Sequence, residues 1–271
     1  MKPHRAPDGT AWFESELLPS VGVRAAFSTR AGGVSLPPFD GLNLGAHVGD
    51  EPAAVGENRR RWFSALGLDP SVPVGIRQVH GAAVVRAGPE ARGHGARDWD
   101  SALADADGVL TVERSLPLFC LSADCALAAL AAPGGAGCAV LHAGWRGLAA
   151  GIIERGAREL AAAAGCRTED LRAFVGPMLG ADSYEVREDF AAALEAAWGP
   201  AEAGRFLRRR PSGGTHFLFD SAVARRFEIA GIAPRNVESA GLCTASRADL
   251  FFSHRTSGGR CGRMAMAVWI T

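Results

Sequence analysis

Residues Phe119 to Gly147 read FCLSADCALAALAAPGGAGCAVLHAGWRG, and the expected fold is built around this stretch. Two apolar runs typical of strands flank Pro133-Gly134-Gly135, which is a turn signal. Cys125 lies on the first run, and His142 closes the second run before a segment with a helical pattern. Strand ends that lead into helices are where α/β proteins place ligand chemistry. A thiol and an imidazole at such ends indicate either a metal site or a thiol nucleophile with its base.

Composition and charge limit the classes of partner. The chain has 271 residues, enough for one large domain or two small ones with a sizeable core. Lys plus Arg and Asp plus Glu number 29 each, so the formal charge is zero. This balance argues against binding to nucleic acid or to an anionic membrane surface. An anionic substrate would have to be bound by a few local arginines.

Cysteine usage and hydropathy favour a cytoplasmic protein. Six cysteines are scattered along the chain, a spacing typical of reduced thiols and not of a small disulfide scaffold. Glu14 and Glu16 interrupt the apolar N-terminal residues, so we expect no secretory signal. The uncharged stretch from Cys125 to Trp145 is broken by Pro-Gly-Gly, and we expect no membrane span.

The apolar periodicity predicts more strands than helices. Strands are expected at 21–29, 74–79, 84–86, 109–112, 118–121, 126–130, 137–141, 172–175, 216–219 and 264–270, and helices at 55–66, 148–164, 188–198 and 221–230. The segment 84–86 is the expected hairpin partner of 74–79, residues 88–97 an exposed loop, and 204–210 a solvated face. Because short turns join many strands, mixed sheets with outer helices are favoured over a parallel doubly wound sheet. Neither GxGxxG nor GxxxxGK[ST] is present in a suitable context.

Three chemically active side chains follow apolar strand-like runs: His80, Cys125 and His142. One thiolate and two imidazoles would form an open three-ligand zinc site with a place for water. The wide spacing of the three suits a catalytic site gathered from several strands, not a CxxC structural motif. A thiol hydrolase that uses Cys125 and His142 is the alternative. Asp105 and Asp107 are expected to cap a turn.

A set of short motifs occurs in fixed order between Phe27 and Arg255. They are FSTRAGGVS, PFDGLNLG, HVGD, RQVHG, DADGVLT, SADC, HAGWRG, GP followed by YEV, CT and FFSHR. The chain thereby resembles the YfiH family, also called multicopper polyphenol oxidoreductase or laccase-domain proteins. The resemblance implies one domain over residues 1–271 and an α/β (α+β) fold, a four-layer α/β/β/α sandwich with mixed β-sheets.

The resemblance also implies a cofactor and an activity. The family binds zinc through the residues that correspond to His80, Cys125 and His142. Its members are assigned phosphorolysis of adenosine, inosine and methylthioadenosine, with adenosine deamination by a metal-activated water. Copper is an alternative metal, but a multicopper oxidase needs about ten histidines in HxH pairs. This chain has seven histidines and no HxH, which argues against that mechanism.

The residues expected to bind nucleoside and phosphate are Arg30, Asn43, Arg146 and Tyr184, with His254 and Arg255 closing the pocket. The structural alternatives are an ion pair for Arg30 and a core position for Tyr184. Two other functions stay open. The first is an amidase that edits a UDP-MurNAc-amino acid with help from residues 205–210, and the second is a zinc-stabilised binding module. We expect a monomer or weak oligomer.

The chain departs from the family pattern at three places. Ala126 to Ala129 stand where the family has Pro and larger apolar residues after ADC. The family's FSYRR reads FSHRT, so His254 replaces a tyrosine. The customary cysteine between Pro177 and Tyr184 is missing.

Overall fold

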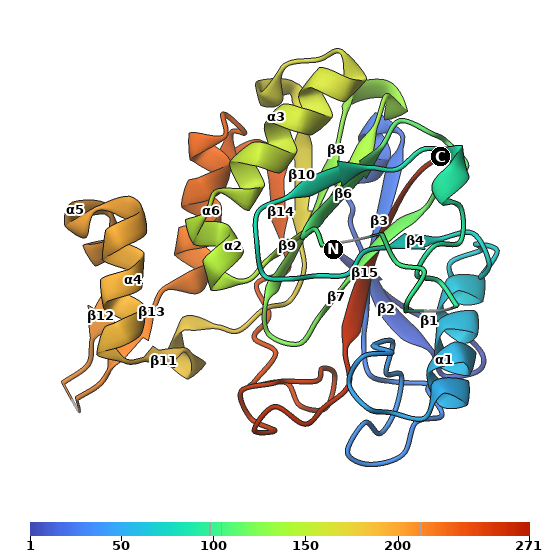
Figure 1. The fold of residues 1–271 in the computed structure, drawn as a ribbon, viewed down its shortest axis with the longest axis horizontal. Coiled ribbons are helices and arrows are strands. Elements are labelled where there is room, and N and C mark those ends of the chain that lie inside the picture. The colour runs from blue at the N-terminus through green and yellow to red at the C-terminus, as the bar shows by residue number, and fades with distance from the viewer. Residues whose placement is uncertain (98, 104, 212) are drawn as a thin grey trace.

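The fold was analysed in a computed structural model, which describes residues 1–97, 99–103, 105–211 and 213–271. Two six-stranded mixed sheets pack face to face (Figure 1). The first sheet contains, in order, β1 (Lys2–Arg5), β2 (Ala11–Glu14), β3 (Val23–Ser28), β15 (Met264–Ile270), β7 (Leu118–Ser122) and β4 (Val74–Gly75). The second contains β14 (Val237–Ser239), β10 (Arg172–Val175), β8 (Ala126–Ala131), β9 (Cys138–Ala143), β6 (Gly108–Thr111) and β5 (Val84–Arg86).

Helices cover the outer face of each sheet. They are α1 (Pro52–Ala65) on the first sheet and α2 (Trp145–Ala149), α3 (Ile152–Ala164) and α6 (Phe219–Ile229) on the second. Helices α4 (Glu188–Trp198) and α5 (Pro200–Gly204) lie in a lobe that projects from the second sheet. Helix α1 packs on the first sheet through Trp62 and Phe63, whereas α2, α3 and α6 pack on the second. The described part of the chain has no helix long and apolar enough to cross a bilayer.

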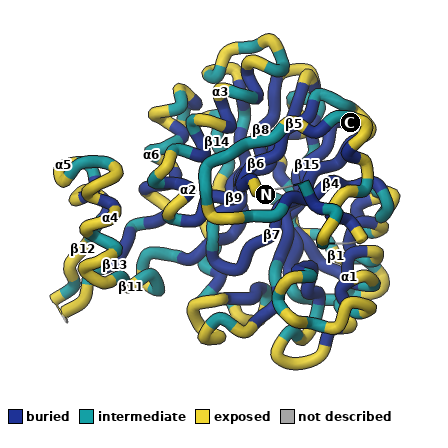
Figure 2. The backbone as a smooth tube through the Cα atoms, viewed as in Figure 1, coloured by how far each residue is buried: buried dark blue, intermediate teal, exposed yellow. Residues whose placement is uncertain are grey.

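Side-chain alternation along the central strands produces the layers. In β15, Met264 and Met266 enter the core between the sheets, while Ala265 faces the α1 side. In β9, Val140 enters the inter-sheet core and Leu141 packs toward α3. These strands are buried on both faces, which explains their continuous apolar sequence (Figure 2). The four-layer α/β/β/α sandwich expected from the resemblance is confirmed.

Several local expectations agree with the structure. Strands β10 and β15 and helix α4 have the expected bounds. Helix α1 begins three residues earlier than expected, and Gly67 follows its end with a left-handed φ of 75°. Gly165 ends α3 in the same conformation, with φ 66°. In each case a glycine supplies the backbone geometry that L-residues avoid.

Other expectations were wrong. The strand expected at 74–79 has only the two residues of β4. Strand β5 does not form the expected hairpin with β4 but pairs in parallel with β6. The helix expected at 148–164 is split into α2 and α3 at Gly151, whose φ is 82°. Residues 88–97 are not a wholly exposed loop, because Gly95 and Ala96 are buried and accept hydrogen bonds from Arg59.

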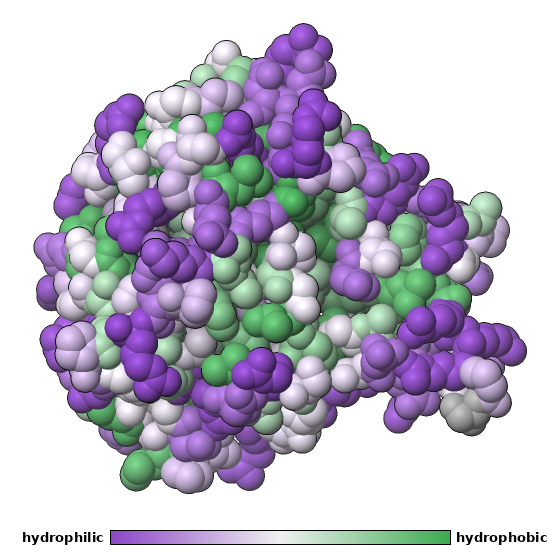
Figure 3. Space-filling model, turned by 180° about the vertical axis from the view of Figure 1, so that it is seen from behind, coloured by the Kyte–Doolittle hydropathy of each residue, from purple (hydrophilic) through white to green (hydrophobic). Residues whose placement is uncertain are grey.

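A small lobe projects from the second sheet at the left of Figure 1. We define the lobe as α4, α5 and a three-stranded sheet of β11 (Glu185–Val186), β13 (Thr215–Phe217) and β12 (Leu207–Arg209). Tyr184 packs edge-on against Phe217 and Phe219 where the lobe meets the body. Hydrophilic side chains gather on the projecting lobe in the opposite view (Figure 3). The segment 204–210, which was expected to be a solvated face, contains strand β12 and the buried side chain of Phe206.

Packing against Leu141 decides the effect of substituting a helical glycine. We expect Gly156→Ala in α3 to destabilise the fold by about 1–3 kcal/mol, because the added Cβ would lie 2.6 Å from both Leu141 methyl carbons. The matched control is Gly56→Ala in α1, where no atom lies within 4 Å of the new Cβ. That variant should gain up to about 1 kcal/mol from helix propensity. Denaturant unfolding of both variants measures the difference, and a stabilising Gly156→Ala would contradict the packing argument.

Candidate metal centre

His80, Cys125 and His142 lie together, each delivered by a different segment. One ligand atom from each side chain lies within 4.8 Å of the other two. His80 belongs to the loop between β4 and β5, Cys125 to the turn between β7 and β8, and His142 to β9. The cluster therefore sits where the two sheets meet. The metal-site interpretation requires this convergence, and the assignment of the three as ligands stays a prediction.

A buried carboxylate orients both histidines. Asp107 is fully buried, and its Oδ1 lies 2.8 Å from Nδ1 of His142. The same carboxylate accepts hydrogen bonds from the backbone N–H groups of Val79, His80 and Gly81 at 3.2, 3.0 and 2.6 Å. With its Nδ1 engaged, His142 has only Nε2 left to offer a metal, as is common for histidine ligands paired with carboxylates. Sequence analysis placed Asp107 in a turn and missed this contact.

A second buried carboxylate holds the turn that carries Cys125. Asp124 has a φ of 89°, a left-handed conformation that is costly for a residue with a side chain. Its carboxylate accepts hydrogen bonds from Thr244 Oγ1 at 2.5 Å, Ser253 Oγ at 3.1 Å and Arg255 N at 2.7 Å. These bonds hold the strained turn in place and connect it to the C-terminal segment.

Two further contacts complete the frame of the cluster. The amide of Gln78 pairs with the backbone of Leu121 in both directions, each at 2.8 Å, and so anchors the loop that carries His80. A Cβ built at Gly144 would lie 3.1 Å from the Cys125 sulfur and 3.2 Å from the His80 ring. A side chain at this position would therefore crowd Cys125 and His80, and glycine avoids this contact.

Electrostatics favours a thiolate beside an imidazolium when no metal is bound. Burial opposes ionisation of Cys125, but the charges and hydrogen bonds of His142 and His80 outweigh it and lower the thiol pKa to about 6. Burial likewise opposes protonation of His142, but Cys125 and Asp107 raise its pKa to about 9. A thiolate is the form of cysteine that binds metals and acts as a nucleophile.

The cluster opens into a pocket of about 370 Å³, within the usual range for small-molecule sites. Besides the three residues of the cluster, the side chains that matter most in its lining are His47, Trp99, Tyr184, His254, Arg255 and Arg263. Tyr184 thus lies where it was expected, and burial raises the pKa of its phenol. His254 and Arg255 also line the pocket, as expected for residues that close it.

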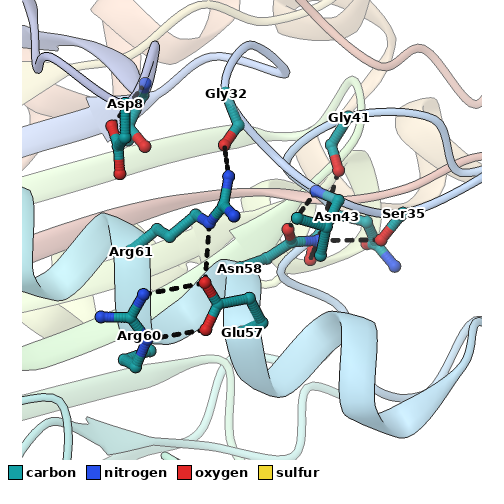
Figure 4. Close-up of polar contacts among 11 residues, drawn as sticks. Asp8, Gly32, Ser35, Gly41, Asn43, Glu57, Asn58, Arg60 and Arg61 are labelled. Carbon is teal, nitrogen blue, oxygen red and sulfur yellow. Dashed lines mark hydrogen bonds and ion pairs between the residues drawn. The ribbon is translucent and has the colours of Figure 1, made fainter.

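The other expected substrate-binding residues do not line this pocket. Arg30 forms an ion pair with Asp40 at 2.8 Å and lies over the Phe252 ring, which is the structural alternative considered for it. Asn43 is fully buried in a polar network, and its carbonyl accepts a hydrogen bond from Asn58 (Figure 4). Arg146 is exposed and stacks on the Trp145 ring at 4.4 Å.

Among the pocket side chains named above, sequence reasoning missed His47, Trp99 and Arg263. His47 belongs to the HVGD motif, which signalled it only through the resemblance. Trp99 stacks on His47 with ring centroids 4.4 Å apart, and no local pattern singled it out. Arg263 follows a glycine-rich segment and reaches the pocket only through long-range contacts.

Comparison with known proteins identifies the family. The model of the family described as multi-copper polyphenol oxidoreductase laccase matches residues 24–271. The chain belongs to this family. A Pseudomonas aeruginosa protein named purine nucleoside phosphorylase is 35% identical over 260 residues, which cover 96% of this chain and 98% of the relative. A Xylella fastidiosa protein of the same name is 41% identical over 261 residues, which cover 93% and 94%.

Solved structures of family members have the same fold. YlmD from Geobacillus stearothermophilus superposes with a TM-score of 0.91 at 30% identity, covering 99% of this chain and 98% of that one. The Bacillus licheniformis hypothetical protein YfiH gives a TM-score of 0.90 at 28% identity, with 99% of each chain covered. The resemblance to the YfiH family is confirmed.

The donor set fits a soft or borderline metal. One sulfur and two imidazole nitrogens suit zinc or copper(I), whereas hard cations prefer oxygen ligands. A zinc site with three protein ligands keeps a fourth position for water or substrate. The pocket in front of the cluster supplies space for that fourth position.

The contact between Asp107 and His142 predicts how the metal affinity responds to mutation. We expect Asp107→Asn to weaken zinc binding about ten- to a hundredfold, because His142 loses the carboxylate that orients its ring. Competition with a chromophoric chelator measures the affinity. Asp105→Asn is the matched control, because this exposed carboxylate pairs with Arg77, which is not a residue of the cluster. Equal zinc affinity in both variants would contradict the role assigned to Asp107.

The pKa directions predict a pH dependence of metal binding. Without metal, Cys125 is a thiolate above about pH 6 and His142 keeps its proton up to about pH 9. A metal must displace that proton, so the affinity should rise about tenfold per pH unit between these values. Above the His142 pKa the gain should level off. Chelator competition at several pH values, corrected for protonation of the chelator, measures the slope; a flat profile would overturn the charge assignment.

Proposed function

We propose that this chain is a metal-dependent purine nucleoside phosphorylase that uses zinc held by His80, Cys125 and His142. The observation that carries the proposal is the His–Cys–His cluster opening into a pocket lined by arginines and aromatic rings. Relatives named purine nucleoside phosphorylase align over more than nine-tenths of the chain, which supports this choice of reaction. The expected substrates are adenosine, inosine and methylthioadenosine.

Phosphorolysis exchanges one bond at the ribose. An oxygen of hydrogen phosphate attacks C1′, the bond from C1′ to N9 breaks, and the electron pair of that bond goes to the purine. The phosphate proton ends on the released base, so charge and atoms balance. A bound zinc would supply Lewis acidity beside the substrate. Asp107 fixes the direction of His142, and Tyr184 offers an aromatic face at the rim.

We further propose adenosine deamination in the same pocket. This reaction adds a water oxygen to C6 of the purine and expels ammonia. Both reactions need the base near the cluster, but only phosphorolysis needs a phosphate ion. Arg146 is proposed to contact substrate beside a second cavity, because it stacks on Trp145, which lines that cavity. Arg30 and Asn43 are better explained as supports of the loop that contains them.

A second candidate is an amidase acting on a peptidoglycan precursor such as a UDP-MurNAc-amino acid. One observation favours it: a neighbouring cavity of about 350 Å³ shares Tyr184 and Arg255 with the main pocket, so a longer substrate has room to extend. Three of the four arginines first considered for it, Arg205, Arg208 and Arg210, form ion pairs with other residues. Arg205 pairs with Glu202, and Arg208 pairs with Asp182 in the lobe.

Removal of a proposed ligand tests both the metal site and the reaction. We expect Cys125→Ala and His142→Ala to lose most bound zinc and to lower inosine phosphorolysis by at least about a hundredfold, because each removes one of three ligands. Metal analysis and release of hypoxanthine with and without phosphate are the measurements. Cys166→Ala is the matched control, since this free thiol is remote from the cluster.

Each outcome separates the candidates. Full metal content in both variants would overturn the ligand assignment. Base release that does not require phosphate would contradict phosphorolysis, and phosphate-independent cleavage of the UDP-MurNAc-amino acid would support the amidase. Zinc binding without turnover of either substrate class would indicate a zinc-stabilised binding module.

A further inference from the structure

Two guanidinium groups line the pocket without a carboxylate partner. Neither Arg255 nor Arg263 forms an ion pair with a described residue, whereas Arg30, Arg77 and Arg226 do. Arg255 donates to the carbonyl of Glu185 and lies over the Tyr184 ring instead. The Asp124 carboxylate also lines the pocket, but its oxygens already accept hydrogen bonds from Thr244, Ser253 and the backbone N–H of Arg255. Positive charge without an ion-pair partner in a concave site attracts anions and raises their local concentration. The pocket therefore favours a ligand with an anionic group.

Arg263 is held by a buried network of hydrogen bonds. Its backbone N–H donates to Oδ1 of Asn43 at 2.8 Å, and its carbonyl accepts from the N–H of Leu44 at 3.0 Å. Asn43 in turn donates through Nδ2 to Asp50 at 2.8 Å and accepts from the N–H of Gly45 at 2.9 Å. These contacts fix the direction of the fully buried amide, so the Asn43 loop sets the position of Arg263.

The side chain of Arg263 passes over a glycine. A Cβ at Gly45 would lie 2.7 Å from Cγ of Arg263, so the arginine stem occupies space that only glycine leaves free. Nη1 of Arg263 donates to the carbonyls of Cys261 and Gly262 at 2.8 and 3.1 Å. The Nε and Nη2 groups have no hydrogen bond to a described residue. They form the planar edge of guanidinium that matches two phosphate oxygens.

The surroundings of Arg263 increase the positive potential. Arg59 is 3% exposed and donates to the carbonyls of Leu44 and Gly95, with no carboxylate partner among the described residues. It thereby ties the segment before His47 to the segment that leads to Trp99. Burial, followed by the charges of Arg263 and Arg59, lowers the pKa of His47. His47 therefore stays neutral near pH 7 and adds no positive charge to that of the guanidinium groups.

We propose that Arg263, positioned by Asn43 and Gly45, binds inorganic phosphate in this pocket, with Arg255 as a second guanidinium. This inference rests on the proposed phosphorylase function and names the residues that hold its second substrate. The proposed phosphate site differs from the one expected from the sequence, which used Arg30 and Arg146. It lies in the pocket that contains the His–Cys–His cluster. The proposed ligand group is a phosphate oxyanion. A nucleoside diphosphate carries the same group, so the experiments must distinguish it from inorganic phosphate.

Steady-state kinetics of Arg263→Gln test the assignment. We expect the KM for phosphate to rise about ten- to a hundredfold, because a charge-assisted hydrogen bond is lost. The KM for inosine should change less than about twofold, and zinc content should be unchanged. The KM for phosphate of Arg263→Lys should lie between those of the wild type and Arg263→Gln, because lysine keeps the positive charge but lacks the planar guanidinium group. Arg260→Gln is the matched control, since this exposed arginine of the same segment does not line the pocket.

Gly45→Ala provides an independent variant that keeps the charge. The new methyl would displace the Arg263 stem, so the KM for phosphate should rise while zinc content and the inosine KM stay near wild type. An unchanged phosphate KM in both Arg263→Gln and Gly45→Ala would overturn the proposal. A rise in both KM values together with loss of zinc would also overturn it, because the residue would then be a general support of the pocket.

Calorimetric titration with inorganic phosphate separates this inference from the proposed function. Phosphate binding to the wild-type protein that is lost in Arg263→Gln supports the site even if no nucleoside is turned over. Turnover of inosine with an unchanged phosphate KM in the variant overturns the site but leaves the phosphorylase function intact. Binding of UDP without binding of inorganic phosphate overturns the assignment to inorganic phosphate.

Discussion

The carboxylate of Asp107 is the contact on which the site depends. A buried carboxylate is costly unless hydrogen bonds satisfy its oxygens. Here three backbone N–H groups of residues 79–81 and the ring of His142 satisfy them. The loop that leaves the first sheet after β4 is thereby attached to β6 and β9 of the second. This attachment keeps residues 76–81 out of the strand and brings His80 to face His142.

Asp124 has the corresponding role on the other side of the cluster. It joins the turn between β7 and β8 to Thr244 and Ser253, segments more than a hundred residues away. Asp107 thus positions the His142 ring and the backbone that carries His80, and Asp124 positions the turn that carries Cys125 and the C-terminal wall of the pocket. Because β7 belongs to the first sheet and β8 to the second, the site can form only when both sheets are packed. Metal binding and folding are expected to be coupled for this reason.

The arginines show how a plausible residue type can serve another purpose. Arg30 follows a strand in a glycine-rich loop, but its guanidinium group forms an ion pair with Asp40. Asn43, a predicted substrate contact, accepts a hydrogen bond from the backbone N–H of Arg263, 220 positions away in sequence. The loop from 30 to 45 therefore contributes to the pocket indirectly, by presenting a residue from the end of the chain. The arginines that line the pocket are Arg255 and Arg263.

By itself the sequence determined the outline of the molecule. The uninterrupted apolar run of β15 and the glycine at the end of α3 reflect local rules of burial and backbone geometry, so both were predicted. Family motifs indicated the sandwich. Tertiary structure alone decided the parallel pairing of β5, the role of Asp107 and which arginines face the pocket. Those features depend on contacts between distant segments, and hydrophobic periodicity carries no information about such contacts.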